Sequence, residues 1–319
     1  MPWILNQALI LRFSLSQIIT TITNKLPVKG VDLADGSMVY SKKDIALVSP
    51  GADLEFSRTY ASQGRHDLGS MGFGWTHNYL SRVTIGQCGQ VIVSGADAGS
   101  ARFKMVGDEF VPSKGFHSSL VLNDDGSFDF FPKSGMRYHY IKMQDSVWWM
   151  NYVEDPNGNR LTVNLEPRAG APVIRSVIDS VGRQLQFSYL LHDFGIYRNE
   201  MLVSVTGPDG MLLTFEYDEI GNLVKANREG DSTNETMTYS GDLSGPSRSL
   251  LLSLTDEPRS NTRAWTYREQ AINPSGLAIP AIGSIETASI SETDAGSTLF
   301  DYTSGTGYNS AAAVTQNDE

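Results

Sequence analysis

The stretch that decides the fold runs from residue 182 to residue 189 and reads GRQLQFSY. Apolar or aromatic side chains stand at every second position, at Leu185, Phe187 and Tyr189, and polar ones stand between them. A side-chain period of two is the geometry of a β-strand with one buried and one solvated face. Val177, five residues before Gly182, closes an earlier apolar stretch. The unit is therefore predicted to be strand, tight turn, strand, which is a β-hairpin.

The same unit recurs along the second half of the chain. Read forward from Gly158, Gly210 and Ser260, the alternating residues are Leu161-Val163-Leu165, Leu213-Phe215-Tyr217 and, less cleanly, Arg263-Trp265-Tyr267. Repeated hairpins that cannot bury a face alone must stack on one another, which favours an architectural protein over an enzyme. We expect one sheet face to bury Leu185, Phe187, Leu213, Phe215 and Tyr217, and the opposite face to expose Gln184, Gln186 and Glu216.

Two of these units resemble the RHS repeat, also called the YD repeat. The first is VIDSVGRQLQFSY at residues 177–189, and the second is GPDGMLLTFEYD at residues 207–218, followed by IGNL. The Tyr217-Asp218 pair is the dipeptide behind the second name of the repeat. The residues that carry the resemblance are Gly182, Arg183, Phe187, Tyr189, Gly210, Phe215, Tyr217, Asp218 and Gly221.

An upstream region resembles the opening domain that precedes such repeats. Its segments are VDLADG at 31–36, FSRTY at 56–60 and LGSMGFGWTHNY at 68–79. Their motif residues are Arg58, Tyr60, Gly69, Gly72, Gly74, Trp75, His77, Asn78 and Tyr79. We expect an ordered structural motif with Trp75 buried and with Gly72 and Gly74 where a side chain would clash. His77 is expected to play a structural part, with its imidazole hydrogen-bonded to backbone or to a hydroxyl.

The resemblance implies a role as well as a fold. Complete relatives form a hollow β shell around a terminal effector, commonly a toxin, in bacterial proteins that are secreted or carried at the cell envelope. By resemblance the chain is a structural, non-enzymatic segment of such a shell, and its partners are the remainder of the shell or a toxin cargo. About four repeats are too few to close a shell, so a fragment is expected. The alternative is a module that binds carbohydrate or a cell-surface partner. Exposed aromatic rings would favour that module, and rings packed inward would favour the scaffold.

The expected fold is all-β, with antiparallel hairpins in an open spiral. Four regions are predicted: an amphipathic helix over 1–24, an opening β domain over 28–147, hairpin repeats over 148–270, and a divergent, partly disordered tail over 271–319. The helix is expected to pack on the β body, because its polar face has few basic residues and membrane contact is disfavoured. We also expect an unpaired strand edge near Ser249 to Tyr267.

Composition and residue spacing indicate no catalytic or ligand-binding motif. The 319 residues include 30 Gly, 13 Pro, 13 Tyr and 13 Phe, as suits many short strands. A net charge of −11 argues against nucleic acid as a partner. Cys88 is the single cysteine, and no two of the five histidines have a helical metal-ligand spacing. We therefore predict no catalytic, cofactor-binding or metal residues. The acidic segments at 123–126 and 155–159 are read as turns rather than calcium loops, and 273–277 as a turn rather than a self-cleavage motif.

Overall fold

A computed structural model of the chain describes residues 29–31, 36–86, 89–95, 100–113, 117–168, 171–195, 197–230, 234–241, 248–257, 259–269, 285–293, 295–302 and 312–317. The expected helix over 1–24, Cys88 and the segment 273–277 lie outside these residues. Within them the fold is all-β, and the helical elements are short 3-10 turns at Ser62–Gly64 and Pro208–Gly210.

Most strands belong to one 20-stranded antiparallel sheet. From β10 onward each strand pairs with the next one along the chain. These strands are β10 (Ser119–Leu122), β11 (Phe128–Phe131), β12 (Arg137–Gln144), β13 (Val147–Glu154), β14 (Arg160–Glu166), β15 (Val173–Ile178), β16 (Gln184–Asp193), β17 (Arg198–Thr206), β18 (Leu212–Tyr217), β19 (Leu223–Arg228), β20 (Asn234–Tyr239), β21 (Leu251–Asp256), β22 (Asn261–Glu269), β23 (Ile285–Glu292), β24 (Gly296–Tyr302) and β25 (Ala312–Asn317).

The sheet forks at β13. The first part of β13 pairs with β6, and its last part pairs with β14. The β6 branch continues by hairpins through β6 (Arg82–Ile85), β7 (Gln90–Ser94), β8 (Ser100–Val106) and β9 (Glu109–Pro112).

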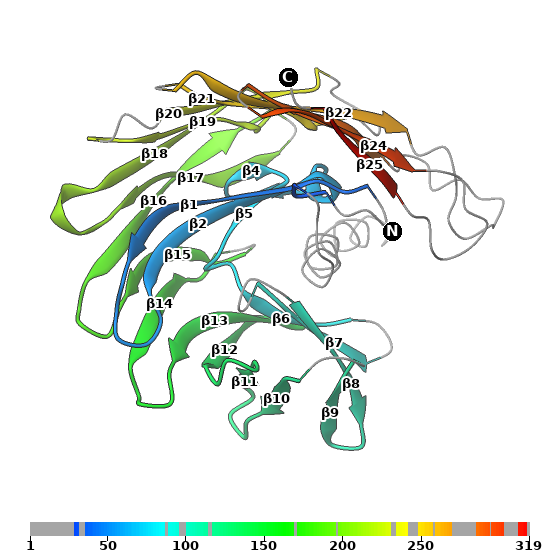
Figure 1. The fold of residues 1–319 in the computed structure, drawn as a ribbon. Coiled ribbons are helices and arrows are strands. Elements are labelled where there is room, and N and C mark those ends of the chain that lie inside the picture. The colour runs from blue at the N-terminus through cyan, green and yellow to red at the C-terminus, as the bar shows by residue number, and fades with distance from the viewer. Residues whose placement is uncertain are drawn as a thin grey trace, which may run out of the picture.

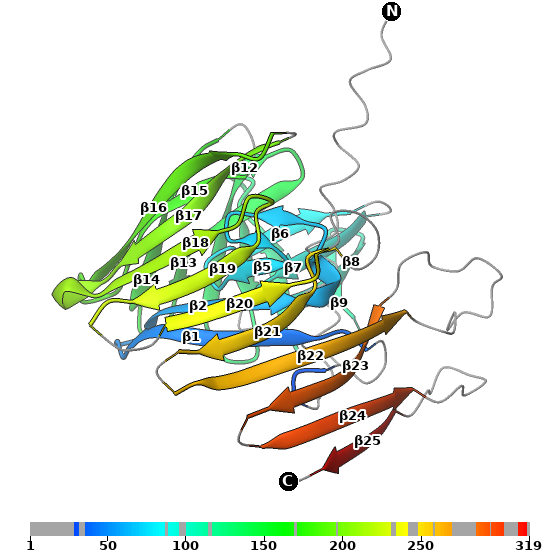
Figure 2. The same cartoon turned by 90° about the horizontal axis from the view of Figure 1, so that it is seen from above.

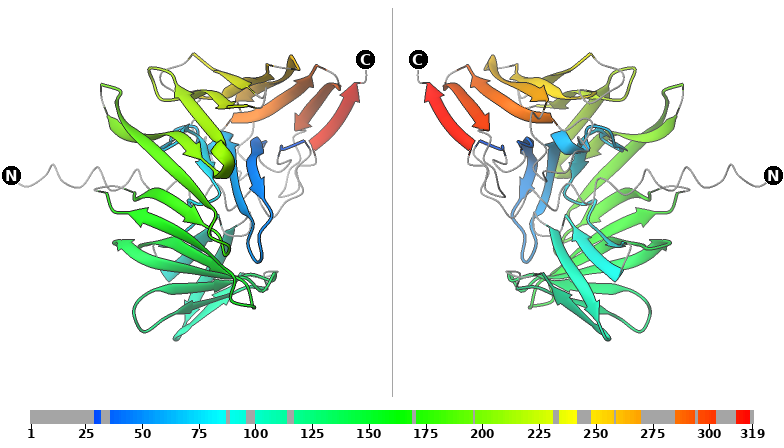
Figure 3. Two further views of the ribbon diagram at one scale, coloured as in Figure 1. Left: turned by 90° about the vertical axis from the view of Figure 1, so that its left-hand side faces the viewer. Right: turned by 90° about the vertical axis from the view of Figure 1, so that its right-hand side faces the viewer.

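From β14 to β25 the strands form an arched wall that does not close on itself (Figure 1). An inner sheet lies under its concave side and consists of β1 (Val39–Leu47), β2 (Leu54–Ala61) and β5 (Trp75–His77), in the order β1-β2-β5. The two-residue strands β3 (Leu68–Gly69) and β4 (Gly72–Phe73) pair with each other beside it. Figure 3 shows the inner strands, in blue, within the curve of the green and orange strands.

The predicted hairpin repeats are present as β14, β16, β18 and β22. Leu185, Phe187, Leu213 and Phe215 are buried, with exposed fractions of at most 4%. Tyr217 is partly buried, and Gln184, Gln186 and Glu216 are exposed, so the predicted register is confirmed. A further copy, missed in the sequence, is β20, where Glu235, Met237 and Tyr239 alternate.

The predicted sheet edge near Ser249 to Tyr267 is wrong. Strand β22 pairs along its length with β23, and the ladder continues through β24 to β25 (Figure 2). These three strands lie in the region expected to be a divergent tail. The physical reason is that threonine suits a pleated strand, and Thr287 and Thr298 are buried at positions that an apolar pattern misses.

Candidate functional site: the junction between the inner sheet and the wall

The inner sheet presents one row of large side chains to the wall. On β2 the alternating residues Phe56, Arg58 and Tyr60 are almost fully buried, and each contacts wall residues far away in sequence. Arg58, predicted as a motif residue, is the one charged member of this row and is 1% exposed. A buried guanidinium needs compensating carboxylates, since an unpaired buried charge is strongly unfavourable.

Two carboxylates meet Arg58, one from each sheet. Within the inner sheet, Arg58 Nε donates to Asp44 Oδ2 at 2.7 Å and Nη2 donates to Asp44 Oδ1 at 3.2 Å. From the wall, Glu235 accepts a further bond from Arg58 Nη2. Glu235 also accepts bonds from Lys42 Nζ at 2.6 Å and from the Tyr40 hydroxyl at 3.2 Å. These five residues form a charged junction between inner sheet and wall.

Local backbone irregularity explains how Asp44 reaches Arg58. The pairing register of β1 and β2 shifts between Lys43 and Ile45, which makes Asp44 the extra residue of a β-bulge. A bulge re-aims a side chain relative to the regular pleat. It thereby brings a carboxylate to the face where Lys42 and Arg58 stand directly opposite each other. Like charges in direct cross-strand contact are unfavourable, and the carboxylates offset this.

The electrostatics of the junction favour its charged form. Burial works against ionisation, but Asp44 and Glu235 outweigh it and raise the pKa of Arg58 above its ordinary value. Burial likewise opposes the Glu235 carboxylate, yet Arg58 and Lys42 hold the pKa of Glu235 below its ordinary value. Burial, followed by the charge of Glu235, raises the pKa of Tyr40. The junction is therefore a set of ion pairs with a neutral phenol at neutral pH.

Beside these charges lies an aromatic cluster around His77. Its ring centroid lies 5.3 Å from that of Phe56 and 5.8 Å from that of Phe187, on which it stacks. Phe56 also packs against Phe215 of the next repeat, at 5.9 Å. Burial lowers the pKa of His77 to about 3, so the ring is neutral.

The expected hydrogen bond of His77 is wrong. Both ring nitrogens are buried and neither has a partner among the residues that the structure describes. The physical reason is the surroundings, because Phe56, Phe187 and Tyr79 enclose the ring and present aromatic surface to it. The structure uses His77 as a packing ring.

The glycine-tryptophan motif fits as predicted. Trp75 is 1% exposed and its Nε1 donates to the hydroxyl of Tyr239 at 2.8 Å. Gly72 and Gly74 both have positive φ, and a Cβ on either would lie 2.7 Å from a neighbouring heavy atom. For Gly72 that atom is the main-chain oxygen of Gly221, which cannot move aside as a flexible side chain would.

The flanks of this motif fasten it in place. Asn199 Nδ2 donates to the main-chain oxygen of Gly69 at 3.0 Å, across to the wall. Asn78 bonds β2 from both ends of its amide, accepting from Ser57 N at 3.1 Å and donating to Glu55 O at 3.0 Å. Tyr79 is buried beside His77.

The wall strands share one irregularity that creates docking points. In every second strand pair from β14–β15 to β22–β23 the register skips one residue at the same place, just before Leu165, Tyr189, Tyr217, Tyr239 and Tyr267. Bulges bend a strand and increase its twist, so their repetition accounts for the arch.

Residues 36–79, which hold the inner sheet and the glycine-tryptophan motif, are called the inner segment. At three of the bulges, the main-chain N–H of the residue paired with the tyrosine donates to the inner segment and not to the neighbouring strand. Leu202 N donates to Ser70 O at 2.7 Å, Leu251 N to the Tyr60 hydroxyl at 3.1 Å, and Thr287 N to Gly36 O at 2.8 Å. The inner segment thus satisfies buried donors that the wall itself leaves open.

The repeat tyrosines tie consecutive repeats together. The hydroxyl of Tyr217 donates to Leu202 O at 2.6 Å, that of Tyr239 to Leu223 O at 2.6 Å, and that of Tyr267 to Leu251 O at 2.8 Å. The three acceptors, Leu202, Leu223 and Leu251, are the cross-strand partners of Tyr189, Tyr217 and Tyr239. Each hydroxyl therefore bonds the partner of the tyrosine one repeat earlier. We call this series the tyrosine ladder. It fixes the spacing between repeats.

The predicted turn residues lie at the rims of the wall, away from the charged junction. Asp179 and Asp218 each cap a turn by accepting two main-chain N–H bonds on Oδ1, and Gly182 and Gly221 take the positive φ. Gly210 has positive φ in the turn before β18. Arg183 bonds Asp179 and reaches the inner sheet through Val48 O at 2.7 Å and Ser49 Oγ at 2.6 Å. One rim therefore anchors the β1–β2 loop.

The structure brings some predicted residues together and adds others. The residues that line the junction are Arg58, Tyr60, Trp75, His77, Phe187, Phe215 and Tyr217. Gly182, Gly210 and Asp218 lie in turns at the rims. Gly221 belongs to both, because its main-chain oxygen accepts from Phe73 N of the inner motif at 3.2 Å. Five residues of the site were not predicted from the sequence: Tyr40, Lys42, Asp44, Glu235 and Tyr239. For Tyr239 a signal existed, because Met237 and Tyr239 stand two residues apart, as Phe215 and Tyr217 do. Within the described residues no group of three or more His, Cys, Asp or Glu could hold a metal ion.

Comparison with known proteins gives one partial family match. A family described as a domain of unknown function, DUF6531, matches residues 29–103, which contain the inner sheet. No curated protein matches the sequence. Among the described residues no helix is long and apolar enough to cross a membrane.

Several solved structures resemble the chain at low similarity. The TcdB2-TccC3 crystal structure is 12% identical with a TM-score of 0.42, and the match covers 92% of this chain and 22% of that one. The Tc holotoxin pore of Photorhabdus luminescens is 12% identical with a TM-score of 0.30, covering 88% and 16%. The N-terminal domain of the effector SpvB from Salmonella typhimurium strain LT2 is 13% identical with a TM-score of 0.28, covering 87% and 99%. The chain thus spans about a fifth of the length of the first of these proteins.

Proposed function

We propose that this chain is a structural, non-enzymatic scaffold: a segment of an RHS-type shell in which repeated hairpins build a curved wall and the opening domain braces it from inside. The observation that carries the proposal is the row of inward main-chain donors at the bulges. Ser70, Tyr60 and Gly36 bond Leu202, Leu251 and Thr287, which lie in three different wall strands. A segment bonded to so many repeats stabilises their curvature.

The orientation of the aromatic rings supports a scaffold over a carbohydrate- or cell-binding module. Phe187, Phe215 and Trp265 are at most 4% exposed, and the hydroxyls of Tyr217 and Tyr267 donate to main-chain oxygens. A sugar-stacking platform needs an exposed ring face, and the faces of these rings are buried in the protein.

The finer role, carriage of a toxin cargo by a secreted or envelope-located bacterial protein, rests on the sequence resemblance to RHS repeats. The curvature of the wall supports this proposal, because a shell must curve around its contents. The partners proposed are the remainder of a shell and a polypeptide held within it.

Native mass spectrometry of the protein purified from its own cells tests this role. A shell segment is expected to retain a second polypeptide, either a shell subunit or a cleaved fragment, that is released by urea and is resistant to protease beforehand. A glycan array on the same preparation provides the opposing arm. Purification as a single species that binds one defined glycan, at an affinity lost when an exposed aromatic ring is removed, would refute the scaffold.

A further inference from the structure

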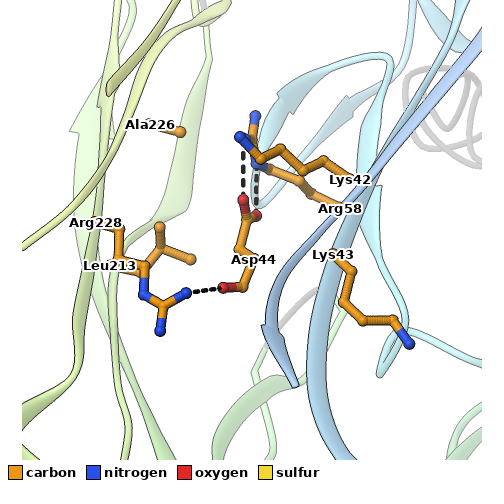
Figure 4. Close-up of a pocket in the computed structure, with 7 residues that line it drawn as sticks. All are labelled: Lys42, Lys43, Asp44, Arg58, Leu213, Ala226 and Arg228. Carbon is orange, nitrogen blue, oxygen red and sulfur yellow. Dashed lines mark hydrogen bonds and ion pairs between the residues drawn. The ribbon is translucent and has the colours of Figure 1, made fainter. Parts of the chain in front are cut away.

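The four charged side chains of the junction are two cations and two carboxylates, so their charges balance within the chain. Asp44 bonds Arg58 through its carboxylate and accepts from Arg228 Nη1 at 3.1 Å on its main-chain oxygen (Figure 4). Another part of the molecule differs from the junction in this respect. It consists of strands β8, β9 and β10, which lie at the lower end of the molecule in Figure 1.

Strands β9 and β10 are the two end strands of the 20-stranded sheet. Within the described residues β9 pairs with β8 alone, and β10 with β11 alone. Phe110 of β9 packs against Phe128 of β11 with ring centroids 5.6 Å apart, so side chains meet across the line between the two end strands. We call this line the seam. No main-chain hydrogen bond joins its two sides among the described residues, so each side presents unpaired N–H and C=O groups.

Strand β10 has none of the features that usually protect an edge strand. Its sequence over 119–122 is SLVL, with no charged residue and no proline, and its register with β11 is regular. Strand β9, by contrast, begins with Glu109 and ends with Pro112. Charges, prolines and bulges on an edge strand prevent it from pairing with another chain. The side of the seam that can accept a further strand is therefore β10.

Exposed apolar side chains gather on both sides of the seam. Eleven large apolar side chains of the described residues are exposed, and five of them lie on these three strands: Met105, Val106, Val111, Val121 and Leu122. On β8 the buried Phe103 is followed on the same face by Met105, which is 55% exposed. On β10 the buried Leu120 is followed in the same way by Leu122, which is 50% exposed. The apolar row of each strand continues past the core, and contiguous exposed apolar surface is typical of an interaction site.

Carboxylates lie at one end of this apolar surface. The series of antiparallel pairs that runs through β13 makes β8 and β10 parallel, so the β8–β9 turn and the β10–β11 turn lie at the same end. These turns and their borders hold four carboxylates: Asp108, Glu109, Asp124 and Asp125. No ion pair among the described residues includes any of the four. The described cations of β8 to β11 are Arg102 and Lys104, so negative charge predominates.

We propose that the seam binds an extended segment of a partner polypeptide, apolar at alternate positions and carrying lysine or arginine at its ends. The segment pairs with the open edge of β10 as an added strand, a mode in which main-chain bonds give affinity and side chains give selectivity. Val121 and Leu122, on opposite faces of β10, contact its apolar residues, and the carboxylates of the two turns attract its cations. This inference does not depend on the scaffold role, because the seam lies outside the wall and the inner sheet.

Fluorescence anisotropy with the whole protein tests the proposal. The probe is a labelled peptide of alternating valine and threonine with two lysines at each end, used at concentrations where it is monomeric. Saturable binding is expected. Replacement of the terminal lysines by glutamates should weaken binding about tenfold or more, because charge complementarity is lost. Replacement of the central valine by proline should also weaken it about tenfold or more, because proline removes a main-chain donor.

Matched variants locate the site. The double variant Val121→Ser with Leu122→Ser should weaken binding of the lysine-ended peptide about tenfold, because it removes the apolar contacts beside the edge. Val181→Ser removes a similarly exposed side chain in the turn between β15 and β16 and should leave binding unchanged. Asp108→Asn with Asp124→Asn should reduce the preference for lysine over glutamate ends. All these side chains are exposed, so each variant is expected to keep the Tm of the parent protein.

Absence of saturable binding, equal binding of the proline and valine peptides, or equal binding of the lysine-ended and glutamate-ended peptides would overturn the proposal. An equal loss of binding in the Val181→Ser variant would also overturn it. Sedimentation velocity without peptide tests the other occupant, a second copy of this chain. We expect the same sedimentation coefficient for the parent protein and the double variant. A dimer that the double variant dissociates would assign the seam to self-association and so contradict the proposal.

Discussion

Replacement of Arg58 by methionine is expected to cost about 3–5 kcal/mol of unfolding free energy, the usual result of breaking a buried ion pair by removing one partner. The substitution keeps much of the side-chain volume but leaves Asp44, which is 8% exposed, without its cation. Glu235 keeps Lys42, so Asp44 bears most of the cost. A loss of this size is a large fraction of the roughly 5–15 kcal/mol that stabilises a typical domain.

A triple variant separates charge from packing. Asp44→Asn, Arg58→Met and Glu235→Leu together remove the three buried charges of the junction and place leucine where β16 and β18 have Leu185 and Leu213. Replacement of a whole buried ionic group by apolar side chains is often neutral or stabilising, so the triple variant should recover most of the loss. Urea unfolding followed by circular dichroism and tryptophan fluorescence measures both, provided the two transitions coincide. A single variant that loses less than about 1 kcal/mol, or a triple variant no more stable than the single one, would refute the reasoning.

Three other perturbations address the motif, the tyrosine ladder and the buried histidine. Gly72→Ala should lower the free energy of unfolding by more than Gly182→Ala. Both positions have positive φ, but only Gly72 would place a Cβ 2.7 Å from a main-chain oxygen. Equal losses in urea unfolding would mean that φ alone matters. Tyr239→Phe removes the acceptor of one hydrogen bond and the donor of another, and should lower the free energy of unfolding by about 1–3 kcal/mol. Amide hydrogen exchange should rise in β19 to β21 before it rises in distant strands, and a uniform rise would contradict the tyrosine ladder. Burial lowers the pKa of His77 from 6.5 to about 3 in the folded protein. Between these two pH values the unfolded chain binds a proton that the folded protein does not. The free energy of unfolding is therefore highest above pH 6.5 and falls by about 1.4 kcal/mol per pH unit on acidification toward pH 3. His77→Phe should remove that part of the pH slope, and an unchanged slope between pH 6.5 and 4 would show that the ring is not buried as described.

The sequence predicted the features that rest on local pattern. The period of two placed Leu185, Phe187, Leu213 and Phe215 on the buried face, and the motif placed Trp75 in the core. What it missed depends on distant partners. Glu235 breaks the apolar alternation of β20, and its reason for being there, Arg58, lies 177 residues earlier in the chain. The continuation of the sheet past β22 was missed because Thr287 and Thr298, with little apolar signal, share its buried positions with Ile290.

The junction combines a repeated device with a unique one, and the difference explains the placement of the inner sheet. Inward main-chain donors stand at three of the five bulges, in β17, β21 and β23, so they do not by themselves single out one repeat. Glu235 does not recur, because the matching positions of β14, β16 and β18 are the apolar Leu161, Leu185 and Leu213. A shift of the inner sheet by one repeat would place Arg58 against Leu213 of β18 or against Arg263 of β22, and would leave Glu235 without its guanidinium partner. The main-chain donors therefore supply attachment, and the single acid at Glu235 selects the register, which is the specificity role for which buried ionic groups are best attested.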